Sequence, residues 1–156
     1  MLHVVLFEPE IPGNTGNVIR LCANAGATLH LIKPLGFRLD DKSLRRSGLD
    51  YHDLADVTVH ENLDACLNEL SSARLFAVET GSGHRYSDIE YHAGDAFLFG
   101  PETRGLPDAV LTRVGRENCV SIPMQPQSRS INLSNAVALV AYEVWRQLKF
   151  VGQAPG

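Results

Sequence analysis

The stretch FLFGPETRGLPDAVLTRVGRENCVSIPMQPQSRSINLSNAVALVAYEVW, residues 97–145, contains two short apolar runs that each lead into a loop of Gly, Pro and small polar residues. The runs are 97–99 and 119–122, and a helical pattern follows each loop. Loops at the carboxyl ends of buried strands are where open α/β sheets bind ligands. Glycine lets a backbone approach another group closely. The stretch therefore predicts a pocket built from two strand-end loops.

The whole chain alternates predicted strands with predicted helices. Strands are expected at 2–7, 28–32, 57–60, 75–78, 96–99 and 119–122. Helices are expected at 14–25, 41–47, 63–70, 108–114 and 132–149, with Asn14 or Thr15 capping the first helix and Gly26 ending it. Residues 81–94 are expected to form a long loop. This alternation is typical of an α/β fold with a mainly parallel sheet in a three-layer sandwich.

The sequence shows no internal repeat and no linker, so we predict a single domain over 1–156. Its ordered core should extend to residue 150, with a tail over 151–156. The final predicted helix is apolar around most of its circumference, and a helix of that kind is buried on all sides. One side should contact the sheet and another a second subunit, which predicts a homodimer. The alternative is that the helix lies deep within one domain.

Composition points to a soluble protein of the cytoplasm. No apolar run approaches the ~20 residues needed to span a membrane, and the N-terminal MLHVVLFEPE lacks the features of a secretory signal. Cys22, Cys66 and Cys119 are scattered among apolar residues, as expected for buried thiols in a reducing compartment. The six histidines do not fall at a metal-ligand spacing with a second ligand, so no metal site is predicted.

The motifs of several common enzymes are missing from the sequence. No G-x-G-x-x-G follows the first predicted strand, no GxxxxGK[ST] occurs, and no G-x-S-x-G is present. The two loops instead carry hydrogen-bonding side chains, namely Glu102, Arg104, Gln125, Gln127, Ser128, Arg129, Ser130 and Asn132. This lining suits an enzyme that positions two substrates, or a binding module, better than a hydrolase.

A basic segment follows the second predicted strand. It contains Arg38, Lys42, Arg45 and Arg46, whereas the net charge of the chain is −4. Such a segment is either a solvated loop and short helix or a surface that contacts phosphates. The acidic net charge argues mildly against a nucleic-acid-binding protein, but the local charge distribution is compatible with one.

Three segments resemble the motifs of the SPOUT superfamily of RNA methyltransferases, in the branch that methylates ribose 2′-hydroxyls. They are NTGNVIRLCANAG (14–26), FLFGPETRGLP (97–107) and SIPMQPQSRSINLSNAVALVAYE (121–143). Their order and separations fit the family, and the resemblance extends over essentially the whole chain. Within this branch the short chain resembles the bacterial tRNA (cytidine/uridine-34-2′-O)-methyltransferases, which act on the wobble nucleotide of particular leucine tRNAs. Two alternatives stay open: methylation of another tRNA or rRNA position, and a non-catalytic RNA- or nucleotide-binding module.

The resemblance implies a C-terminal deep trefoil knot, whose loops hold S-adenosylmethionine. It also implies a homodimer through the first and last helices, and the tRNA anticodon stem-loop as partner, with no metal. Periodicity does not predict a knot, since knots are almost absent from proteins. The implied cofactor-binding residues are Val78, Gly100, Ile122, Ser130 and Leu133. The basic segment, Arg38, Lys42, Arg45 and Arg46, is the expected RNA-binding surface.

The resemblance assigns catalytic roles to Arg20, Asn14, Glu102 and Asn132. Arg20 would bind an RNA phosphate and steer the 2′-hydroxyl, whose proton would pass to a phosphate oxygen or to Glu102. Each residue also has a simpler structural interpretation. Arg20 has apolar neighbours and can extend to solvent, Asn14 and Asn132 can cap helices, and Glu102 can pair with Arg104.

Overall fold

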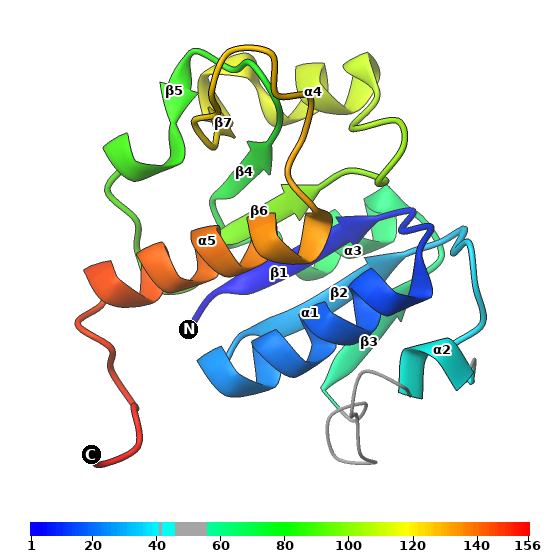
Figure 1. Cartoon of the computed structure of the whole chain (residues 1–156), viewed down its shortest axis with the longest axis horizontal. Helices are drawn as coiled ribbons and strands as arrows, with labels where there is room; N and C mark the ends of the chain where they lie inside the picture. Colours follow the sequence, from blue (N-terminus) through cyan, green and yellow to red (C-terminus); the bar gives the residue numbers. More distant parts are fainter. Residues whose placement is uncertain (41, 46–55) are drawn as a thin grey trace.

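Seven parallel strands form one sheet in the computed structural model, which describes residues 1–40, 42–45 and 56–156 (Figure 1). The strands are β1 (His3–Phe7), β2 (Thr28–Ile32), β3 (Val57–His60), β4 (Leu75–Val78), β5 (His84–Arg85), β6 (Ala96–Phe99) and β7 (Cys119–Ser121). Their order is β3-β2-β1-β6-β4-β7-β5, and every neighbouring pair is parallel. The predicted mainly parallel sheet is therefore confirmed.

Helices cover both faces of this sheet. They are α1 (Pro12–Ala25), α2 (Lys42–Arg45), α3 (Leu63–Glu69), α4 (Asp108–Val114) and α5 (Leu133–Gln147). In Figure 1, α1 and α5 lie side by side in front of the sheet and α3 lies behind it. Successive residues of a strand point to opposite faces, so Val4 packs with Val18 of α1 and Val137 of α5. Its neighbour Val5 belongs to the second core, with Cys66 of α3.

The segment 81–94 differs from the predicted loop. It contains the short strand β5 and a 3-10 turn, η1 (Tyr86–Asp88). In β5, His84 pairs with Val120 and Arg85 with Ser121 at the edge of the sheet. Both residues of β5 are exposed and polar, so they carry none of the apolar periodicity by which the other strands can be predicted.

The first helix begins two residues before the predicted cap. Ile11 occupies the N-cap position with an extended backbone and no side-chain cap, and Pro12 follows at the first turn. Proline suits this position because its missing N–H would have no helical partner. The interpretation of Asn14 as a helix cap is therefore wrong. The predicted end is confirmed, since Gly26 adopts a left-handed conformation with φ 65°.

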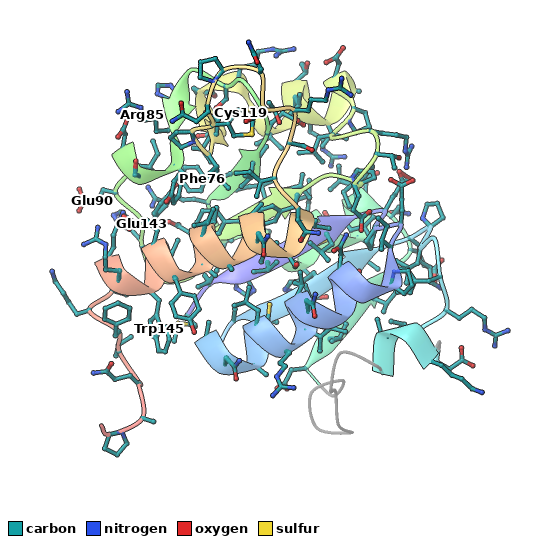
Figure 2. All side chains as sticks on the ribbon, in the orientation of Figure 1. Phe76, Arg85, Glu90, Cys119, Glu143 and Trp145 are labelled. Atoms are coloured by element: carbon teal, nitrogen blue, oxygen red, sulfur yellow. The ribbon has the colours of Figure 1, made fainter. Side chains whose placement is uncertain are left out.

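The last helix has one face in solvent when a single chain is considered. Val137, Val140 and Val144 are buried, but Leu139 and Tyr142 are 42% and 43% exposed. The alternative that α5 lies deep within one domain is therefore wrong, and the predicted contact with a second subunit stays a prediction. The Trp145 indole N–H of α5 donates to the carbonyl of Val151 at 3.0 Å, in the C-terminal segment that follows the helix (Figure 2).

The cysteines match their predicted environment, since Cys22, Cys66 and Cys119 are all buried free thiols. Burial raises the pKa of the Cys22 thiol to about 12. Within the described ranges, none of the helices combines the length and the apolar character required to cross a membrane.

Candidate active site at the carboxyl ends of the strands

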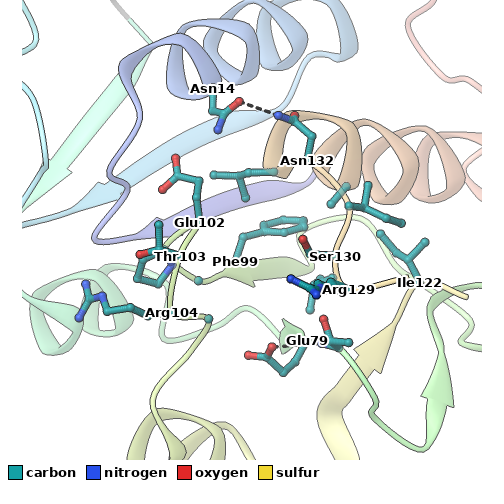
Figure 3. Close-up of a pocket in the computed structure, with 18 of the residues that line it drawn as sticks. Asn14, Glu79, Phe99, Glu102, Thr103, Arg104, Ile122, Arg129, Ser130 and Asn132 are labelled. Atoms are coloured by element: carbon teal, nitrogen blue, oxygen red, sulfur yellow. Dashed lines mark hydrogen bonds between the residues drawn. The ribbon is translucent and has the colours of Figure 1, made fainter. Parts of the chain in front are cut away.

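A cavity of ≈ 500 Å³ lies where β4, β6 and β7 end (Figure 3). Its walls come from segments that are distant in sequence: 78–80 at the end of β4, 99–105 at the end of β6, 122, 124 and 129–132 between β7 and α5, 133 and 136 of α5, and 11 and 14 at the start of α1. The predicted lining residues Gln125, Gln127 and Ser128 do not belong to these walls. Because β4, β6 and β7 run parallel and adjacent, their carboxyl ends meet at the same edge of the sheet. The pocket predicted from the two strand-end loops is therefore present.

The structure brings all five expected cofactor-binding residues to this cavity: Val78, Gly100, Ile122, Ser130 and Leu133. Three of these residues contribute apolar side chains to the cavity wall: Val78, Ile122 and Leu133. Phe99, at the end of β6, adds an aromatic ring that the sequence analysis did not assign. The cavity thus combines apolar walls with the polar groups of the loops, as ligand-binding pockets generally do.

Gly100 is required by the path of its own loop. A Cβ at this position would lie 2.5 Å from the backbone nitrogen of Leu106 and 2.6 Å from the carbonyl carbon of Gly105. Backbone atoms at that distance cannot give way without moving the loop. Gly105 adopts φ +69°, which side chains rarely tolerate. These two glycines let the chain after β6 fold back on itself and form one wall of the cavity.

Glu79 is a cavity residue that the sequence analysis missed. It directly follows β4, and its Oε2 accepts a hydrogen bond from the Leu106 backbone N–H at 3.0 Å. Its Oε1 accepts from the backbone N–H of Thr80 at 3.1 Å. The carboxylate therefore connects the end of β4 to the loop after β6. A charged residue immediately after a buried strand was the signal that could have identified it.

Glu102 contacts the start of α1 rather than Arg104. Its two carboxylate oxygens accept hydrogen bonds from the backbone N–H groups of Glu10, at 2.8 Å, and Ile11, at 3.1 Å. Arg104 instead lies 3.5 Å from a carboxylate oxygen of Glu8. The predicted Glu102–Arg104 pair is therefore wrong, because the acceptor groups of Glu102 are engaged by a segment about ninety residues away in the chain.

The contact between these segments is reciprocal. The Glu10 carboxylate accepts hydrogen bonds from the backbone N–H of Thr103 at 3.0 Å and from its hydroxyl at 2.7 Å. The backbone hydrogen bond from Thr103 is the main reason that the pKa of the Glu10 carboxyl lies below its usual value. Four hydrogen bonds thus join the loop after β6 to the segment before α1.

Asn14 and Asn132 meet at the rim of the cavity (Figure 3). The side-chain amide of Asn132 donates to Oδ1 of Asn14 at 3.0 Å. The other end of the same side chain accepts from the backbone N–H groups of Ser134 and Asn135, at 3.0 and 3.3 Å. The N-cap prediction for Asn132 is therefore confirmed, and the same side chain also ties α5 to α1.

Arg20 lies apart from the other three residues expected to be catalytic. It is exposed on α1 between the buried Ile19 and the partly buried Leu21, and it does not line the cavity. A helical rise of about 1.5 Å per residue puts its Cα roughly 9 Å along the axis from that of Asn14. A different arginine, Arg129, lines the cavity from the loop after β7. The sequence analysis counted Arg129 as polar lining without giving it a role.

The basic segment is described only in part. The Arg38 guanidinium donates to the Asp40 carboxylate, at 3.1 Å from Nε, and Lys42 is exposed at the start of α2. Of Arg45 only the helical backbone is described, and Arg46 lies outside the described residues. Arg38 and Lys42 are thus both exposed at the surface, and the Arg38 guanidinium is paired with the Asp40 carboxylate.

The chain belongs to the SpoU rRNA Methylase family, whose model matches residues 1–142. Among its relatives, a tRNA (cytidine(34)-2′-O)-methyltransferase from Yersinia pestis is 57% identical over 157 residues, an alignment that covers 97% of both chains. This similarity extends over the cavity and all three motifs quoted above.

Solved structures share the same fold. One, described as giving structural insights into the 2-OH methylation of C/U34 on tRNA, has a TM-score of 0.89 and 46% identity, covering 96% of this chain and 97% of that one. The SpoU methyltransferase AviRb from Streptomyces viridochromogenes, in complex with the cofactor AdoMet, has a TM-score of 0.82 and 26% identity. That match covers 98% of this chain and 59% of AviRb.

Proposed function

We propose that this protein transfers a methyl group from S-adenosylmethionine to the ribose 2′-oxygen of the wobble nucleotide, cytidine 34 or uridine 34, of tRNA. The observation that carries the proposal is the meeting of all three motifs at one cavity, in a chain that is 57% identical to a tRNA (cytidine(34)-2′-O)-methyltransferase. Leucine tRNAs, recognised through the anticodon stem-loop, are the proposed substrates.

The residues of the cavity fit S-adenosylmethionine, which supplies an electrophilic methyl group when bound. A volume of ≈ 500 Å³ is within the range of small-molecule sites. The apolar side chains of Val78, Ile122 and Leu133 suit a flat purine base, and Ser130 and the loop backbone offer hydrogen bonds. Two carboxylates, Glu79 and Glu102, line the same cavity together with the guanidinium groups of Arg104 and Arg129, so both signs of charge are present for a ligand that carries a carboxylate, an amine and a sulfonium.

The protein accelerates this reaction mainly by alignment. Fixing two reactants in attack geometry can lower a barrier by up to ~7–11 kcal/mol. Asn14, Asn132 and Glu102 hold the ends of α1 and α5 against the cavity, and Arg20 binds an RNA phosphate and orients the 2′-hydroxyl. A guanidinium suits this role because it donates several hydrogen bonds and stays protonated.

The proton of the 2′-hydroxyl passes to a phosphate oxygen of the RNA in this proposal. Glu102 is the other candidate acceptor, but both of its oxygens accept backbone N–H groups that join the loop after β6 to α1. A carboxylate that holds two segments together has to keep its position. We therefore assign Glu102 to the positioning of the site rather than to proton transfer.

A homodimer through α1 and α5 is part of the proposal. The exposed side chains of Leu139 and Tyr142 on α5 support it, since apolar groups on one helix face gain free energy when a second subunit covers them. The proposal also includes the trefoil knot in the C-terminal part, phosphate contacts by Arg38, Lys42, Arg45 and Arg46, and a cytoplasmic location, where the tRNA substrate occurs.

Methylation of defined tRNAs tests the proposal. An unmodified leucine tRNA should accept one labelled methyl group at nucleotide 34 in a single-turnover reaction. The same tRNA with a 2′-deoxyribose at position 34 is the control, and it should accept none. Methylation of the control, or of another tRNA or rRNA position, would favour a sister enzyme. Cofactor binding without methylation of any RNA would favour a non-catalytic module.

A further inference from the structure

Three histidines on neighbouring strands form a continuous hydrogen-bonded row. Nδ1 of His3, on β1, lies 3.2 Å from Nε2 of His30, on β2. Nδ1 of His30 in turn lies 3.0 Å from Nε2 of His60, at the end of β3. Only 1% of His30 and 6% of His60 is exposed. Two imidazoles are thus enclosed in the protein with their ring nitrogens facing each other.

Helix α3 adds a thiol to this pair of rings. Cys66 is fully buried, and one ligand atom from each of His30, His60 and Cys66 lies within 4.8 Å of the other two. Burial raises the pKa of the Cys66 thiol to about 11, so a neutral thiol is expected unless a cation lies beside it. Cys22 and Cys119 are also buried thiols, but neither belongs to such a group in the described part of the chain.

We propose that His30, His60 and Cys66 bind a divalent transition-metal ion, with Zn²⁺ as the preferred ion. Imidazole nitrogen and thiolate sulfur are the ligands that zinc favours, at about 2.0–2.1 Å and 2.3 Å. Tetrahedral angles then put the two nitrogens about 3.3 Å apart and each nitrogen about 3.6 Å from the sulfur. The nitrogens of His30 and His60 lie 3.0 Å apart, and the three ligand atoms lie within 4.8 Å of one another, so the three side chains already converge on the position that an ion would occupy.

Each histidine already has a partner for its second ring nitrogen. Nε2 of His30 faces Nδ1 of His3, and Nδ1 of His60 lies 3.8 Å from Oε2 of Glu69. Metal-binding histidines are commonly oriented in this way, and a carboxylate on the second nitrogen strengthens the ligand. The charges also balance: a divalent cation, the Cys66 thiolate and the half-exposed Glu69 carboxylate sum to zero, which lowers the cost of burying the cation and the thiolate.

A second cavity lies next to the row of histidines. It has a volume of ≈ 490 Å³, and His3, His30 and Glu69 contribute to its walls. Asp95 and Thr28, also in these walls, lie where β6 and β2 begin, at the opposite end of the strands from the active-site cavity. None of His30, His60 and Cys66 lines the active-site cavity, so the metal is structural in this proposal: it joins β2, β3 and α3.

Cobalt binding tests this site directly. The full-length protein, freed of metal with a chelator, should bind one Co²⁺ per chain and develop the visible absorption of a tetrahedral site, with a thiolate-to-cobalt charge-transfer band. Zn²⁺ should displace the cobalt and raise the melting temperature. Cys66→Ala should lose the charge-transfer band and bind Zn²⁺ at least tenfold more weakly. Cys22→Ala, which removes a buried thiol outside the group formed by His30, His60 and Cys66, is the matched control and should keep the spectrum.

Glu69→Gln provides a second measurement. Because the Glu69 side chain is half exposed, the substitution should affect folding little. It should weaken Zn²⁺ binding roughly tenfold, the lower end of the usual loss when such a partner is removed. A protein that binds no stoichiometric Co²⁺, or a Cys66→Ala variant that keeps the charge-transfer band, overturns the proposal. If Cys66→Ala does not fold, unchanged Zn²⁺ affinity in Glu69→Gln overturns it.

Discussion

The Asn132 side chain donates a hydrogen bond to Asn14 at 3.0 Å across 118 residues of sequence. It also caps α5 through its oxygen. One amide thus fixes the start of the last helix and attaches it to the first helix, at the rim of the cavity. These two functions reside on different atoms of the side chain, so substitutions can separate them.

Asn132→Asp should keep the helix cap and lose the contact with Asn14, because an ionised carboxylate accepts hydrogen bonds but cannot donate one. We expect almost unchanged thermal stability, with a clear loss of single-turnover methylation. Asn132→Ala loses both contacts and should also cost about 1 kcal/mol of stability. Full activity in Asn132→Asp would show that the contact between the two amides has no part in positioning the site.

Glu102→Gln separates positioning from proton transfer. Removing a general base typically lowers the rate by about 10²–10⁴-fold. Gln retains one acceptor oxygen for the start of α1. If Glu102 only positions the site, the methylation rate should therefore fall by less than this factor and keep the wild-type pH profile. Thr103→Val is the matched control because it removes the hydroxyl donor to Glu10 from the reciprocal contact and leaves Glu102 in place. A hundredfold loss in Glu102→Gln alone would identify Glu102 as the base.

Gly100→Ala should abolish cofactor binding. The added Cβ would lie 2.5 Å from the Leu106 backbone nitrogen, so the loop that forms one cavity wall has to move. Overpacking of this kind typically costs about 1–3 kcal/mol. Gly83→Ala is the control, since no atom lies within 4 Å of its added Cβ. Calorimetric titration with S-adenosylmethionine and thermal melting measure both effects, and wild-type affinity in Gly100→Ala would contradict the expected loop displacement.

Tyr142→Glu should disrupt the homodimer. Tyr142 is 43% exposed on α5 in the single chain, so the substitution should alter association more than the fold of one subunit. Light scattering should give a dimer mass for the wild type and a smaller or aggregated species for the variant. Thr112→Glu, at an exposed position on α4, should remain dimeric. A monomeric wild-type protein would contradict the proposed dimer.

The strands could be predicted from the sequence because a parallel sheet covered on both faces reads as continuous apolar runs. That signal placed β2, β3, β4 and β6 at their observed bounds. It could not reveal β5, because two exposed residues at a sheet edge form hydrogen bonds without burying apolar surface. The predicted helix ends were correct where Gly26 and Asn132 act as caps. The predicted start of α1 was wrong, because Pro12 rather than a polar cap begins that helix.

The cavity lining was predictable because it follows strand ends, whereas side-chain partners were not. The alternative interpretation of Glu102, a pair with Arg104 two residues away, is wrong because Glu102 contacts the segment before α1. His30, His60 and Cys66 lie on three separate elements, so no motif spacing brings them together. Sequence periodicity reports which face of an element is buried, but it contains no information on which distant side chain lies opposite.

Arg20→Ala should remove methyl transfer while leaving the fold and cofactor affinity intact. Arg20 is exposed on α1 and does not line the cavity, so stability should change by no more than about 0.5 kcal/mol. Cofactor affinity should persist because the cavity walls come from other residues. Methylation of nucleotide 34 should nearly vanish, since the 2′-hydroxyl is no longer oriented. Arg20→Lys should restore little activity, because an ammonium group cannot reproduce the planar guanidinium.

Thermal melting, cofactor titration and single-turnover methylation on the same preparations distinguish the possible roles of Arg20. A loss of methylation with unchanged melting and cofactor affinity supports a role in binding the RNA and orienting its ribose. An alanine variant that methylates at nearly the wild-type rate means that Arg20 is a surface residue extending to solvent.

Arg38→Ala is the comparison for phosphate binding alone: it should weaken tRNA binding and reduce the slope of log affinity against log salt by up to about 0.7–0.9. At saturating tRNA, Arg38→Ala should then reach the wild-type rate, whereas Arg20→Ala should not.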